Sequence, residues 1–160
     1  MFQMDEMSLR FVCDRMLGSL CKWLRFLGFD TIYPADVNDK RIDELIHKDS
    51  RILLTRDRSF ANKARSRTLL IRSLHRDEQL KEVDREFNII GLSLEGKLLL
   101  SRCSVCNHSL NIINKDEIEG LVPRGVYECQ DSYWSCPECE KYYWPGTHYM
   151  EILNKIETLK

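Results

Sequence analysis

The amino-acid sequence predicts an α/β domain with a doubly wound parallel sheet of about four strands and flanking helices, followed by a smaller cysteine-rich unit. Two observations lead to this prediction. Short strand-like runs alternate with helical patterns through residue 87, an order typical of parallel sheets with helical crossovers. From about residue 88 the alternation stops, and five of the seven cysteines fall in the remaining chain.

The expected strands and helices follow one another in regular order. The strands are short runs rich in aliphatic and β-branched residues: 9–13, 30–34, 51–55 and 68–72. Each is followed by a segment whose apolar residues recur every three or four positions: 15–28, 38–50, 58–67 and 77–87. Gly28 is a credible end for the first helix, because glycine accepts the left-handed conformation that often closes a helix.

These patterns also divide the chain. We expect an α/β domain over 8–88 and a linker over 89–101, with a short strand possible at 97–100. The cysteine-rich domain is expected over 102–160, and it ends in a helix at 149–159.

The composition is that of a globular protein, with 43% hydrophobic and 31% charged residues in a chain of 160. This length suffices for one domain, or for one small domain plus an appendage. No apolar stretch approaches the roughly 20 residues that span a bilayer, and the N-terminus lacks the apolar segment of a signal peptide. We therefore expect a cytoplasmic protein without a membrane partner.

A basic segment lies between residues 51 and 76, where eight arginines and lysines accompany one acid, Asp57. A surface field of this sign favours a polyanion such as nucleic acid, although a solvated helix face is an equally ordinary explanation. Arginines beside an acidic site are suited to hold phosphates. The substrate-binding candidates are Arg15, Arg56, Arg58 and Lys63.

Acidic residues follow three successive strands of the predicted sheet. Asp14 follows the first strand, Asp39 the second and Asp57 the third. Because the carboxyl ends of parallel strands meet at one sheet edge, we expect these carboxylates to lie close together. Asp43, one helical turn after Asp39, is a fourth candidate, with Glu44 as its alternative.

Carboxylates that converge in this way favour a hard cation, Mg²⁺ or Mn²⁺. Such a metal polarises a phosphodiester and lowers the pKa of a bound water. Each acid alone has a simpler explanation, since Asp14, Asp39 and Asp57 all stand where an aspartate caps a helix. The sequence leaves both interpretations open.

The cysteines form two CxxC pairs, Cys103 with Cys106 and Cys136 with Cys139. This spacing predicts a tetrahedral Zn²⁺ site, and four thiolates leave no position for substrate, so the zinc is structural. His108 and His148 are alternative ligands that the four thiolates make unnecessary. Cys13 and Cys21 are expected in the core. Cys129 is interpreted as a buried small hydrophobe placed there as well, with a fifth-ligand or redox role as the alternative.

Three segments carry a resemblance to a known family. "FVCDRML", "NDKRIDELI" and "ILLTRDRSFA" resemble the acidic motifs of PIN-like ribonuclease domains. "DRMLGSLCKWLRFLGFDT", followed by the cysteine-rich tail with "YWPGTH", resembles the family named for the C-terminal RNase domain of the Mut-seven exonucleases. That family joins a PIN-like domain to a zinc ribbon, and the resemblance covers roughly residues 8–155.

The resemblance implies a ribonuclease fold and activity, with Asp14, Asp39 and Asp57 as metal ligands and Asp43 or Glu44 as a further one. Lys40 and Arg41 occupy positions where relatives often carry acids. The leading hypothesis is a metal-dependent ribonuclease that hydrolyses RNA. The alternative is a non-catalytic RNA-binding adapter, in which the zinc ribbon and the basic segment bind and the acids only cap helices.

Overall fold

The computed structural model describes residues 9–34, 39–64 and 67–159. The chain divides into two compact units, Met1–Asn107 and His108–Lys160, and each is described by itself. The domain limits expected from the sequence stay a prediction. Within the described part of the chain, no helix is both long and apolar enough to cross a membrane.

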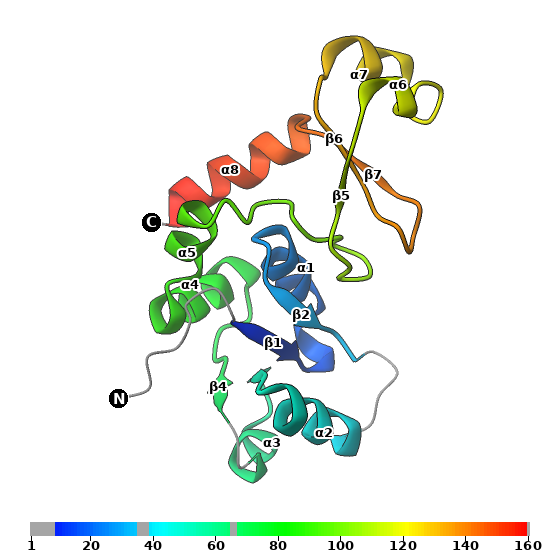
Figure 1. Cartoon of the computed structure of the whole chain (residues 1–160). Helices are drawn as coiled ribbons and strands as arrows, with labels where there is room; N and C mark the ends of the chain where they lie inside the picture. Colours follow the sequence, from blue (N-terminus) through cyan, green and yellow to red (C-terminus); the bar gives the residue numbers. More distant parts are fainter. Residues whose placement is uncertain (1–8, 35–38, 65–66, 160) are drawn as a thin grey trace. The chain divides into compact units, whose positions relative to one another are not determined.

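The first unit is built on a parallel sheet of four strands in the order β2-β1-β3-β4 (Figure 1). The strands are β1 (Arg10–Cys13), β2 (Asp30–Ile32), β3 (Ile52–Thr55) and β4 (Thr68–Leu70). Their register places the ends of β1 and β3 side by side, with Cys13 opposite Leu54. The predicted α/β fold class is therefore confirmed.

Helices follow the strands as the sequence predicted. They are the 3₁₀ turn η2 (Arg15–Leu17), α1 (Gly18–Phe26), α2 (Asp39–Asp49), α3 (Arg58–Lys63) and α4 (Arg76–Phe87). Gly28 closes the first helical segment with a φ of +91°, and a Cβ there would lie 2.2 Å from the carbonyl oxygen of Leu98. Only glycine fits this turn.

The sheet is covered on both faces. Successive residues of a strand point to opposite faces, so Phe11 and Val12 of β1 define two cores. Val12 belongs to a buried cluster with Ile42 and Ile46 of α2. Phe11 instead makes an edge-to-face contact with Phe87 of α4, with ring centroids 5.7 Å apart. Hence α2 covers one face and α4 the other.

The segment after α4 contains a helix that the sequence did not predict, α5 (Ile89–Glu95). Ile89 and Ile90 are buried, and the Ser93 hydroxyl donates a 2.6 Å hydrogen bond to the carbonyl of Leu27. The short strand expected at 97–100 is wrong, because these residues form turns.

The second unit contains an antiparallel sheet in the order β5-β6-β7 and ends in α8 (Thr147–Leu159). Its other elements are β5 (Asn111–Ile113), α6 (Lys115–Ile118), α7 (Arg124–Cys129), β6 (Tyr133–Ser135) and β7 (Tyr142–Tyr143). Tyr133 is buried, and its hydroxyl donates a 2.9 Å hydrogen bond to the carbonyl of Gln130. The core placement expected for Cys129 is wrong, because this residue is exposed at the end of α7.

Candidate functional site

Asp14 lies directly after β1 and connects it to the end of β3. Its side chain is 8% exposed and caps η2, because Oδ1 accepts a 2.8 Å hydrogen bond from the Met16 N–H. Oδ2 accepts one from the Arg56 N–H at 2.9 Å and another from the Thr55 hydroxyl. The capping interpretation therefore describes one oxygen of Asp14, while the other is bonded to a different strand.

Thr55, the last residue of β3, is a member of this site that the sequence reasoning missed. Its hydroxyl donates to Asp14 and accepts a 3.0 Å hydrogen bond from the Asp57 N–H. The residue is fully buried. The available signal was a hydroxyl at the end of the apolar run "ILLT", where an aliphatic residue would otherwise continue the core.

Asp57 begins the next helix. Its Oδ1 accepts hydrogen bonds from the N–H groups of Ser59 at 2.7 Å and Phe60 at 3.1 Å, so the side chain caps α3. The side chain is exposed, and no described residue donates to Oδ2. The cap thus uses only one of the two carboxylate oxygens.

One pocket collects these groups. It has a volume of about 160 Å³ and is lined by Asp14, Arg15, Met16, Ile42, Asp57 and Phe60. Ile42 comes from the first turn of α2, the helix that begins at Asp39. The side chains of Asp39 and Asp43 lie outside the described residues. Two of the four predicted acids therefore share a pocket, and the catalytic role of all four stays a prediction.

The basic candidates differ in placement. Arg15 lines the pocket, whereas Arg58 and Lys63 are exposed at the two ends of α3. Arg56 supplies its backbone N–H to Asp14, and among the described side chains its Nε is a buried donor without a partner. Arg51 is part of the fold, because its buried guanidinium pairs with Asp30 at 2.8 Å.

The core expectation for the two other cysteines of the first unit is confirmed, since Cys13 and Cys21 are buried. Burial raises the pKa of the Cys13 thiol well above its ordinary value, and a hydrogen bond to Cys21 adds to the shift. Cys13 is therefore a neutral core group, although it precedes Asp14 in the chain.

The two CxxC pairs come together. The Sγ atoms of Cys103, Cys106, Cys136 and Cys139 all lie within 4.8 Å of one another. A tetrahedral site with Zn–S bonds of about 2.3 Å places its sulfurs about 3.8 Å apart, so the donor set fits such an ion. His108 is not part of this group and lies 3.7 Å from Glu138. The side chain of His148 is outside the described residues.

Comparison with known proteins shows the family of the chain. The family model of the Mut7-C RNAse domain matches residues 9–156. The chain therefore belongs to the Mut7-C RNase domain family. No solved structure matches it.

A curated human protein, "Exonuclease mut-7 homolog", is 32% identical to this chain over 111 residues. The match covers 66% of this chain and 12% of the human protein. The chain thus spans a small part of the length of this relative. The class of protein is a nuclease-family domain, in agreement with the resemblance found in the sequence.

Proposed function

We propose that the chain is a metal-dependent ribonuclease, a hydrolase that cleaves RNA at the pocket beside β1 and β3. One observation carries the proposal. Asp14 and Asp57 line the same pocket and are connected through Thr55, in a chain that belongs to an RNase domain family. RNA as the substrate and the cytoplasm as the location belong to the proposal.

In this proposal the acids bind the metal and a neighbouring arginine binds the RNA. Asp14, Asp57, Asp39 and Asp43 would hold Mg²⁺ or Mn²⁺, and their hard oxygens fit such a cation. When bound, the metal supplies Lewis acidity and a water of lowered pKa. The three hydrogen bonds to Asp14 hold its carboxylate in place before substrate arrives. Arg15 at the pocket is suited to hold a phosphate of the RNA.

The four cysteines would hold a Zn²⁺ ion as a structural element. A site of four thiolates is closed to substrate, so the ion stabilises the fold of a region too small to build a large core. RNA hydrolysis would then take place only at the acidic pocket of the first unit.

Asp57→Asn is the sharpest test of catalysis. Asparagine caps a helix about as well as aspartate, so α3 and the fold should survive while the charge at Oδ2 disappears. Replacing a residue that only orients a metal ligand typically lowers activity roughly 10- to 100-fold. We expect Asp57→Asn to lower Mn²⁺-dependent cleavage of single-stranded RNA by more than that. Asp84→Asn is the matched control, because Asp84 also accepts a backbone hydrogen bond, from Ile90 at 2.8 Å, away from the pocket.

The second candidate, a non-catalytic RNA-binding adapter, is favoured by the caps that Asp14 and Asp57 form. The two candidates make opposite predictions for Asp57→Asn. If this variant and the wild type both bind RNA and neither cleaves it with added Mn²⁺ or Mg²⁺, the adapter is correct and the ribonuclease proposal fails.

A further inference from the structure

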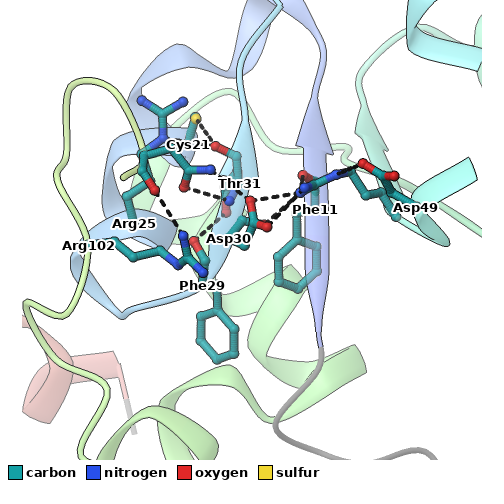
Figure 2. A network of polar contacts seen from close by, with 10 residues as sticks. Phe11, Cys21, Arg25, Phe29, Asp30, Thr31, Asp49 and Arg102 are labelled. Atoms are coloured by element: carbon teal, nitrogen blue, oxygen red, sulfur yellow. Dashed lines mark hydrogen bonds and ion pairs between the residues drawn. The ribbon is translucent and has the colours of Figure 1, made fainter. Parts of the chain in front are cut away.

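The turn that carries the first cysteine pair is anchored to the sheet of the first unit. Figure 2 shows the polar contacts around Asp30 and Thr31 of β2, the strand to which the turn is anchored. Arg25 of α1, only 7% exposed, makes the first contacts. Its Nη1 donates to the carbonyls of Ser104 and Val105 at 3.2 and 2.7 Å, and these are the two residues between the cysteines. Its Nε donates to the carbonyl of Thr31 in β2 at 2.9 Å. One buried guanidinium therefore joins the turn to a strand.

Asn107, the residue after Cys106, makes the second set of contacts. Its Oδ1 accepts a 3.0 Å hydrogen bond from the Thr31 N–H, and its Nδ2 donates to Asp30 Oδ1 at 2.7 Å. Because β2 lies at the edge of the sheet, the Asn107 side chain satisfies the Thr31 N–H, which no other strand of the described residues pairs. The cysteine turn thus takes the place of a neighbouring strand at Thr31.

The turn is also closed on itself. The Asn107 N–H donates to the carbonyl of Cys103 at 3.0 Å, and Arg102 Nη1 donates to the carbonyl of Asn107 at 2.9 Å. Asn107 adopts a left-handed φ of +71°, which asparagine tolerates better than most residues. The backbone on both sides of Cys106 is therefore determined by contacts other than the sulfurs.

Asp30 in turn is held by Arg51, whose two terminal nitrogens approach the two carboxylate oxygens at 2.8 and 2.9 Å. Burial alone would raise the pKa of Asp30, but hydrogen bonds from Arg51 and Asn107 outweigh it and lower that pKa. Asp30 is therefore a charged acceptor for Asn107, and such hydrogen bonds are stronger than neutral ones.

We infer that the α/β unit builds half of the cysteine metal site before any metal binds, with Arg25 and Asn107 as positioning residues for Cys103 and Cys106. Ordering a turn costs conformational entropy. When two thiolates are already oriented, the free energy of metal binding does not have to offset that cost. Metal affinity is therefore coupled to the contacts at β2, and the coupling is reciprocal. This inference does not depend on the proposed ribonuclease activity.

The affinity for the metal tests the inference. Asn107→Gly keeps a residue that accepts the left-handed φ and removes only the side-chain amide. We expect this variant to bind Co²⁺ or Zn²⁺ about 10- to 100-fold more weakly in competition with a chelator, as for other residues that orient metal ligands. Ile46→Val is the control, because it weakens the core of the same unit without touching the turn and should leave the affinity unchanged.

Hydrogen exchange provides the second measurement, since the Thr31 N–H donates to the Asn107 side chain. In chelator-treated wild type this amide should stay protected while amides of the second unit exchange rapidly, and Asn107→Gly should abolish the protection. An Asn107→Gly affinity within twofold of wild type would overturn the inference. Loss of Thr31 protection on chelation alone would also overturn it, including the case in which chelation unfolds the first unit.

Discussion

The acidic pocket and the cysteine cluster differ in the interactions that position their side chains. Asp14 and Asp57 accept backbone hydrogen bonds that help the protein fold, so both are held in place without a cation. Thiols are weak hydrogen-bond partners, so the four sulfurs within 4.8 Å of one another, which could bind a metal ion, depend more on the backbone turns around them. The comparison teaches that a side chain that accepts backbone hydrogen bonds is positioned directly by the fold, whereas a thiol is positioned through the backbone that carries it.

From the difference between the two regions, we expect the largest loss of stability when a cysteine of the cluster is replaced. Cys136→Ser removes one thiolate, and structural zinc contributes about 10–16 kcal/mol of apparent folding free energy in small domains. We expect the variant to lose its zinc in metal analysis and the second unit to lose its circular dichroism signal. Cys129→Ser, at an exposed cysteine outside the cluster, is the control and should behave as wild type. Retention of one zinc by Cys136→Ser would refute the assignment of this ligand.

Substitutions in the acidic pocket should cost less stability, because its side chains keep their other hydrogen bonds when one is removed. Thr55→Val preserves the shape of the side chain but deprives Asp14 of a donor and the Asp57 N–H of its acceptor. Unsatisfied buried groups of this kind cost about 1–3 kcal/mol each. Urea unfolding should show this loss, and Thr55→Ser, which retains the hydroxyl, should recover most of it. Equal stability of the valine and serine variants would mean that the hydroxyl bridge contributes nothing.

Asp30 supports the cysteine turn, and its lowered pKa predicts that the stability of the folded protein depends on pH. Its pKa is lower in the folded protein than its ordinary value of 3.8. Its contribution to stability is therefore present above pH 4 or so and is lost as the pH falls through the folded-state pKa. We expect Asp30→Asn to be less stable than wild type at pH 7, with a smaller difference at pH 3. Other effects of pH act on both proteins, so the quantity compared is the difference between their unfolding free energies at each pH.

The smallest effect is expected on the protein surface. Arg58→Ala and Lys63→Ala should each weaken binding of single-stranded RNA a few-fold and reduce the salt slope by about 0.7 for each phosphate that is no longer neutralised. Lys81→Ala is the control, because Lys81 is a basic residue of α4 that pairs with Glu78. The measurement is RNA affinity at several salt concentrations. If the slope of log affinity against log salt is equal in all variants, Arg58 and Lys63 do not contact the RNA.

Local pattern was sufficient for most elements of the first unit. The runs at β1 and β3 and the helical spacing of α1, α2 and α4 are properties of neighbouring residues, and all were predicted close to their observed bounds. Helix α5 was missed because its stability comes from elsewhere: Asp84 accepts the Ile90 N–H, and the Ser93 hydroxyl bonds to Leu27. Arg51 was counted with the basic surface for the same reason, since its partner Asp30 is 21 positions away.

The sequence by itself determined which chemical groups the chain carries and the order in which strands and helices present them. It placed acids after successive strands and cysteines in two close pairs. Tertiary structure alone decided that Thr55 bonds to Asp14 across 41 positions, and that Asn107 bonds to Thr31 across 76. The physical reason is that helix and strand periodicity are local, whereas the partner of a buried hydrogen-bonding group is chosen by whichever distant segment the fold brings beside it.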